Sequence, residues 1–166
     1  MSASGSSRPS TGSTDVGAEG AAGAPVRMLT MAVGVVFLLV GVLGFIPGIT
    51  SDYSSLSFAG HMSGAKLLGI FQVSVLHNIV HVVYGVVGIA MARRTASAVL
   101  YLTAGGAVYL VLWIYGLLVS AQSAANFVPL NTADDWLHFV LGLGMIGLGL
   151  FGRQAAARAA NGPTYG

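Results

Sequence analysis

The chain has 166 residues, of which 55% are hydrophobic and only 7% are charged. Soluble domains carry roughly a quarter charged residues, so this composition excludes a soluble surface and indicates a protein embedded in lipid. The net charge of +2 gives no argument for a nucleic-acid partner, and the absence of cysteine excludes disulfides, iron–sulfur clusters and thiolate zinc sites.

The two ends of the chain differ from its middle. Residues 1–25 are rich in Ser, Gly, Thr and Ala and have almost no large apolar side chains. Such a segment cannot bury enough surface to offset the entropy of ordering it. We therefore expect disordered tails over residues 1–25 and 154–166, on either side of a membrane domain over residues 26–153.

Four uncharged apolar runs follow one another in the membrane domain. They predict spans over residues 28–46, 67–92, 98–120 and 134–152. A spanning helix needs about 20 apolar residues, within a range of roughly 17–25. The sequence thus predicts an all-α fold, an integral membrane bundle of four transmembrane helices. Thr132 with Asp135 is expected to cap the last helix, as a variant of the capping box.

Basic residues lie almost entirely on one side of these spans. Six of the seven flank the first span's start, the turn after the second span, or the end of the fourth: Arg8, Arg27, Arg93, Arg94, Arg153 and Arg158. By the positive-inside rule that side is cytoplasmic. We expect a multi-pass protein with both termini in the cytoplasm.

A weak internal repeat relates the second and fourth spans. Residues 78–85 (NIVHVVYG) align with residues 135–142 (DWLHFVLG), and both runs lead to arginine. The alignment favours two tandem helical hairpins related by a pseudo-twofold axis, although eight positions in apolar helices also agree by chance.

Polar side chains interrupt the second span on one face. At about 100° per residue, His77, Asn78 and His81 share an arc with small residues. Counted from the cytoplasmic arginines at about 1.5 Å per residue, His77, Tyr109 and His138 fall in one layer of the outer leaflet. His81 lies about a turn deeper, without a named partner. Residues 126–131 (NFVPLN) are expected to fold back over this layer as a lid, close to His138.

The candidate polar site therefore contains seven residues: His77, Asn78, His81, Tyr109, Asp134, Asp135 and His138. The leading interpretation is that the histidines organise helix packing, with His77 bonding to Tyr109 or a backbone carbonyl and His138 pairing with Asp134. The first alternative is a proton relay, or a site that binds or transports a small ligand. The second is a metal site at His77 and His81, completed by His138 with Asp134 or Asp135, or a haem held between His77 and His138.

The sequence assigns no reaction to these residues. No nucleophile–base pair with a plausible third member appears, so no catalytic residue is named and the interpretation leans away from an enzyme. No cofactor is predicted. The expected partners are the lipid bilayer and further copies of this chain, because a bundle of four spans is minimal for transport.

Three blocks of the sequence resemble a known family. They are LGFIPGIT (residues 43–50), FQVSVLHNIVHVVYGVVGIAMARR (residues 71–94) and NFVPLNTADDWLHFVLGLGMIGLG (residues 126–149). They are similar to small bacterial membrane proteins, mostly actinobacterial, described as domain of unknown function 4383. The resemblance covers residues 27–153. It implies a four-span protein of the bacterial plasma membrane and no activity, cofactor or catalytic residue.

Overall fold

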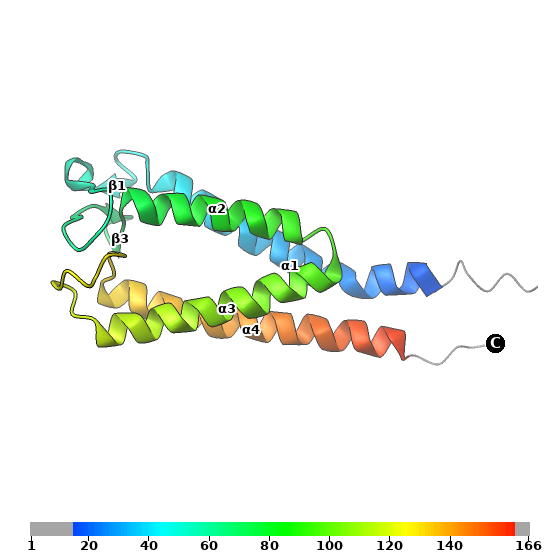
Figure 1. The fold of residues 1–166 in the computed structure, drawn as a ribbon. Coiled ribbons are helices and arrows are strands. Elements are labelled where there is room, and N and C mark those ends of the chain that lie inside the picture. The colour runs from blue at the N-terminus through cyan, green and yellow to red at the C-terminus, as the bar shows by residue number, and fades with distance from the viewer. Residues whose placement is uncertain (1–14, 162–166) are drawn as a thin grey trace, which may run out of the picture.

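A computed structural model describes residues 15–161, which form mainly helices (Figure 1). The helices in this part of the chain are α1 (Asp15–Leu43), α2 (Val75–Met91), α3 (Thr95–Leu118) and α4 (Thr132–Ala160). Between α1 and α2 lie β1 (Thr50–Ser51), a 3-10 turn (Tyr53–Ser55), β2 (Lys66–Leu67) and β3 (Phe71–Gln72). These strands form a small antiparallel sheet in the order β1-β2-β3, with Thr50 opposite Leu67 and Lys66 opposite Gln72.

The two ends of the helix assembly differ in composition (Figure 1). The arginine end holds the turn Arg93–Arg94 between α2 and α3, together with the start of α1 and the end of α4. The strand end holds β1–β3 and the segment of residues 119–131 between α3 and α4.

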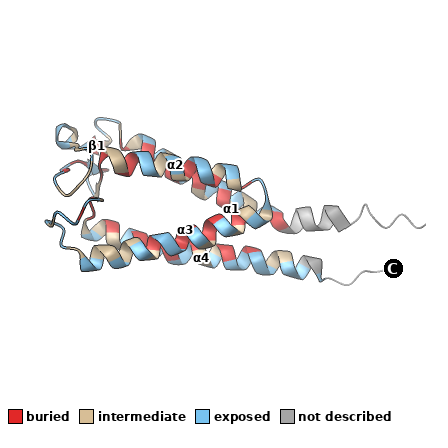
Figure 2. Ribbon diagram, in the orientation of Figure 1, coloured by how far each residue is buried: buried red, intermediate tan, exposed pale blue. Residues whose placement is uncertain are grey.

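Three helices within the described residues are long and apolar enough to cross a membrane: Gly23–Leu43 of α1, Thr95–Leu118 of α3 and Thr132–Arg158 of α4. The second helix, α2, is apolar but shorter, with 17 residues. Large apolar side chains are exposed along all four helices, among them Leu39, Val83, Val111 and Val140. Buried positions lie on the faces that the helices turn toward one another (Figure 2). This pattern is typical of helices surrounded by lipid.

The predicted second span begins too early. Residues 67–74 are not helical: they form the end of β2, a turn, β3 and the cap of α2. Leu68 and Gly69 have φ angles of 54° and 73°, a left-handed conformation that turns the chain sharply between the strands. Ser74 then accepts a hydrogen bond from the backbone of His77 and starts α2. An apolar run alone could not reveal this turn.

The helix ends also differ from the predicted ones. α1 begins at Asp15, within the expected tail, and the Ala-rich composition after it favours a helix. α4 continues to Ala160, past the expected end at residue 152. Its capping box uses Asn131 and Asp134 rather than Thr132 and Asp135. The expected disorder of residues 1–14 and 162–166 falls outside the described residues.

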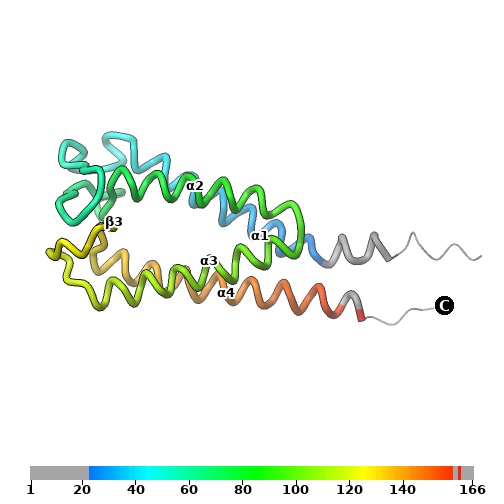
Figure 3. Tube along the Cα trace, viewed as in Figure 1, coloured from blue at the N-terminus to red at the C-terminus, as the bar shows by residue number. Residues whose placement is uncertain are grey.

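Helix backbones approach closely at paired glycines. A Cβ on Gly34 of α1 would lie 3.0 Å from the carbonyl oxygen of Gly85 on α2. A Cβ on Gly142 of α4 would lie 3.0 Å from the carbonyl oxygen of Gly106 on α3. Only residues without a side chain permit such contacts. The extensive helix interfaces are accordingly α1 with α2 and α3 with α4, whereas α2 and α3 contact each other little and diverge from their shared turn toward the strand end (Figure 3).

Candidate functional site: a histidine-lined cavity

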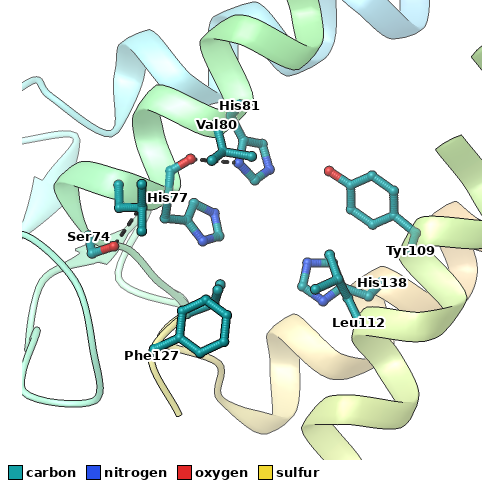
Figure 4. A pocket seen from close by; sticks show the side chains of 10 residues that line it. Ser74, His77, Val80, His81, Tyr109, Leu112, Phe127 and His138 are labelled. Carbon is teal, nitrogen blue, oxygen red and sulfur yellow. Dashed lines mark hydrogen bonds between the residues drawn. The ribbon is translucent and has the colours of Figure 1, made fainter. Parts of the chain in front are cut away.

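A cavity of about 170 Å³ lies where α2 and α3 have diverged, near the strand end. Its polar side chains come from three helices: His77 and His81 from α2, Tyr109 from α3 and His138 from α4. Its walls are apolar and comprise Leu76, Val80, Leu112, Phe127 and Val128. We call it the histidine cavity (Figure 4).

The two histidines of α2 are positioned by the start of their helix. The Ser74 hydroxyl oxygen accepts a bond from the His77 backbone N–H at 3.1 Å. His81 follows one turn later, so its ring stacks on that of His77, with centroids 4.3 Å apart and planes 12° from parallel. The Nδ1 of His81 lies 3.0 Å from the His77 carbonyl oxygen. Because a carbonyl only accepts, Nδ1 carries the proton, and Nε2 of the neutral ring is an acceptor.

The other polar groups face them from the second helix pair. Tyr109 and His138 are buried, with 5% and 4% of their surface exposed, and their rings lie 5.2 Å apart. The Tyr109 hydroxyl points across the cavity toward His81 (Figure 4). Phe37 of α1 lies beneath both, with centroids 5.3 Å from Tyr109 and 5.6 Å from His81. An apolar aromatic floor thus holds the layer in place.

Most polar atoms of the cavity have no partner inside its lining. The bonds among the lining residues are those of Ser74 and of the His77 carbonyl (Figure 4). The buried Nδ1 of His138 makes no hydrogen bond within the described part of the chain. Buried polar groups are normally bonded, and leaving one unpaired costs about 1–3 kcal/mol. The unpaired His138 nitrogen therefore supports a ligand or water beside this residue.

A second cavity of about 100 Å³ lies on the other side of the same four polar side chains. It is bounded by Val40 of α1, Leu137 and Leu141 of α4, and the strand segment. His77, His81, Tyr109 and His138 line both cavities. These side chains therefore form a layer between two hollows rather than a solid core.

A roof of hydrogen-bonded loops covers the layer at the strand end. Three bonds join residues 60–72 to residues 127–134: Gly60 N–H to the Phe127 carbonyl at 2.7 Å, Asn131 Nδ2 to the Ile70 carbonyl at 2.8 Å, and Gln72 N–H to Asp134 Oδ2 at 3.1 Å. Phe127 and Val128 line the cavity together with His138, so residues 126–131 fold back over it as expected.

The structure separates the seven predicted residues into three groups. His77, His81, Tyr109 and His138 come together, and His81 belongs to the cluster instead of lying apart. Asp134 lines only the smaller cavity. Asn78 and Asp135 line neither of the two cavities: Asn78 is buried against Gly44 of α1, and the Asp135 carboxylate lies against Gly116 of α3.

The expected pair of His138 with Asp134 does not form. Asp134 Oδ2 accepts from the backbone N–H groups of Asn131 and Gln72, at 3.0 and 3.1 Å. The capping box and the roof thus engage this carboxylate and leave His138 Nδ1 unbonded. The i, i+4 spacing could not reveal this, because the competing donors come from a loop distant in sequence.

Phe37 and the apolar walls were not predicted. Phe37 shares the face of Gly34, Gly41 and Gly44 on α1, at spacings of three and four residues, and that periodicity is the signal that could have found it. Leu112 carries no such signal, because its neighbours Val111 and Trp113 are apolar as well.

No three histidine or acidic side chains among the described residues are arranged to hold a metal ion. His77 and His81 stack face to face, and the orientation of His81 is set by its bond to a carbonyl. A metal or haem at these residues is an alternative that needs a test of its own.

Comparison with known proteins gives one match. A family model described as "Domain of unknown function (DUF4383)" matches residues 27–151. No curated protein and no solved structure matches the chain significantly.

Proposed function

Because the chain belongs to the DUF4383 family, whose description assigns no activity, we propose a function from the site itself: an integral membrane protein that binds a small ligand in the histidine cavity. The observation that carries this proposal is the convergence of three histidines and Tyr109 on an apolar hollow, with His138 Nδ1 unbonded within the described residues. Apolar pockets with a few convergent polar groups are the usual form of a ligand site. Ionisable residues inside a membrane generally mark function.

The competing function is helix packing by the histidines. It is supported by ring contacts between helices, His81 with Phe37 of α1 and His138 with Tyr109 of α3. The hydrogen bond that a cavity histidine ring makes runs from His81 to the His77 carbonyl within α2. That bond joins residues of one helix and does not fix the register of α2 against its neighbours. His138, which would have to bond across or along helices, leaves its Nδ1 unpaired. These contacts favour ligand binding over packing.

The ligand proposal is tested by filling the cavity. Leu112→Trp places a large ring in the histidine cavity, whereas Val111→Trp, one residue earlier, faces outward from a position 64% exposed. Solvent extracts of the purified proteins are compared by mass spectrometry. We expect a small molecule in near-stoichiometric amount with the wild type and with Val111→Trp, and its loss from Leu112→Trp. Equal content in all three proteins would refute the proposal.

The same preparations test the cofactor alternative. A bound haem gives an intense Soret absorption band, and a bound metal gives a stoichiometric signal in elemental analysis. Either signal, present in the wild type and lost from both His77→Phe and His138→Phe, would favour a haem or metal centre over an organic ligand bound by hydrogen bonds.

We further propose that α2 completes a fourth span and that the two helix pairs are tandem hairpins in the bacterial plasma membrane. A helix of 17 residues is about 26 Å long, close to the roughly 30 Å of a hydrocarbon core. Its short turn to α3, with Arg93 and Arg94, supports a cytoplasmic arginine end. A reporter that is active only outside the cytoplasm should be inactive after Gly166 and active when inserted at Gly60. The reverse pattern would overturn this orientation.

A further inference from the structure

The opening of the histidine cavity bears on the kind of ligand it takes. We infer that the site binds a membrane-soluble molecule with a hydroxylated head of about one ring and an alkyl tail, and that this molecule enters sideways between α2 and α3. The inference rests on the proposed function and names its ligand class and route.

The surroundings of the histidine cavity indicate the route by which the ligand enters. The strand end is closed by the roof, where three hydrogen bonds join the strand segment to residues 127–134. On the α1 side, the Phe37 ring packs against the rings of Tyr109 and His81. Between α2 and α3, by contrast, the wall includes Val80, which is 53% exposed and therefore also reaches the outer surface. This side faces lipid, so a ligand reaches the cavity from the bilayer.

The volume of the histidine cavity limits the size of the ligand's head group. The cavity measures about 170 Å³, close to the roughly 150 Å³ of an engineered apolar cavity that holds benzene. A single six-membered ring fits this space. An alkyl tail attached to the ring would pass between Val80 and Leu112 into the lipid.

The hydrogen-bonding groups of the cavity indicate that the ligand carries a hydroxyl. His81 presents Nε2 as an acceptor, because its Nδ1 proton is used by the His77 carbonyl. Tyr109 offers a hydroxyl that both donates and accepts. A ligand hydroxyl can donate to His81 Nε2 and accept from Tyr109 at the same time. A head with only acceptors, such as an ester or a ketone, would leave Nε2 unpaired.

His138 supplies the second, independent observation. Its side chain is 96% buried (4% exposed), lines the cavity and has an unpaired Nδ1 within the described residues. It faces His77 across the hollow (Figure 4). A second polar substituent on the ring would lie beside the His138 side chain there. The chemistry thus fits alkylphenols and alkylated ring diols better than phospholipids, whose charged heads are too large and too polar for these walls.

The test uses two probes that differ in one group. 4-Octylphenol and 4-octyltoluene are titrated into the full-length protein in lipid nanodiscs, with affinity expressed as mole fraction in the lipid. Two hydrogen bonds at about 1 kcal/mol each correspond to about a tenfold difference or more. We expect the phenol to bind at least tenfold more tightly. His81→Phe, which keeps an aromatic ring, should remove most of that preference and leave 4-octyltoluene unchanged.

The route is tested with cysteines, because the chain has none of its own. In Val80→Cys/Leu112→Cys, a short reducible bis-thiol cross-linker joins α2 to α3 across the opening. Bridging should slow 4-octylphenol binding at least tenfold, and reduction should restore it, while singly modified Val80→Cys binds at the normal rate. Unchanged kinetics in the bridged protein would overturn the lateral route.

Failures of the two proposals can be told apart. If extraction recovers a ligand that Leu112→Trp loses, but the two probes bind alike or neither saturates, the ligand class is wrong and the proposed function stands. If extraction recovers nothing and neither probe saturates, both are wrong.

Discussion

The arginine end and the strand end of this molecule are built from the same helices but pack differently. Toward the arginine end the backbones touch: Gly85 packs on α1, and the Tyr101 hydroxyl donates to the Tyr84 carbonyl at 3.2 Å. Toward the strand end α2 and α3 separate, and His138 carries a buried nitrogen without a partner in the described structure. The contrast between joined and separated helices suggests that one half supplies stability and the other leaves room for a ligand beside polar side chains.

The largest expected effect is on the packed half. Gly85→Leu would force a side chain into the α1 backbone, where even a Cβ lies 2.7 Å from the Gly34 carbonyl oxygen. We expect the free energy of unfolding to fall by about 3 kcal/mol or more, or the folded protein to be lost. Chemical unfolding in detergent measures it. Gly144→Leu is the control, because a Cβ there meets nothing within 4 Å, and it should be neutral or slightly stabilising.

The second-largest effect on stability is expected in the roof. Asp134→Ala removes the acceptor for both Asn131 N–H and Gln72 N–H, and a lost cap with an unpaired amide costs about 1–3 kcal/mol. Amide hydrogen exchange should accelerate at Gln72 and in the first turn of α4. Ala133→Ser, in the same turn, should leave exchange at Gln72 unchanged; equal acceleration in both variants would contradict the role of Asp134.

A substitution in the histidine cavity is expected to change stability less, and it can raise the free energy of unfolding instead of lowering it. His138→Phe removes a buried nitrogen that has no partner among the described residues, so the free energy of unfolding should stay within about 1 kcal/mol of the wild type or rise. Ligand content should fall in the same protein. A loss of about 2 kcal/mol or more would instead favour packing as the role of this histidine.

The smallest effect is expected at the edge of the opening. Phe127 is 58% exposed and lines the cavity, so Phe127→Ala should change stability by less than about 0.5 kcal/mol. The rate of 4-octylphenol binding should increase several-fold, because the entrance widens. Phe151→Ala, equally exposed at 59% but away from the cavity, should leave the rate unchanged.

The sequence was sufficient to predict the features that depend on a residue's depth along its helix and on helical periodicity. Counting from the arginines placed His77, Tyr109 and His138 in one layer, and all three line one cavity. The small residues that share an arc with His77 on the second span include Gly85, and this residue packs closely against Gly34 of α1.

The sequence was insufficient for features that depend on the conformation of loops. The strands and turn in residues 67–74 read as more of an apolar span, because a turn at Leu68 and Gly69 leaves no periodic signal. Asp134 was assigned to His138 because its stronger partners, backbone N–H groups of Asn131 and Gln72, depend on how a loop returns. The cavity itself follows from the divergence of α2 and α3, which no single helix encodes.

The histidines themselves give the most direct test of the account. The chain contains four: His77, His81 and His138 line the cavity, and His61 lies in the loop outside it. In ¹⁵N-histidine NMR spectra of the protein in nanodiscs, 4-octylphenol should shift the ring resonances of the three cavity histidines, with His81 Nε2 remaining an acceptor, and leave His61 unchanged. No shift at any of the three, or an equal shift at His61, would contradict a ligand site in this cavity.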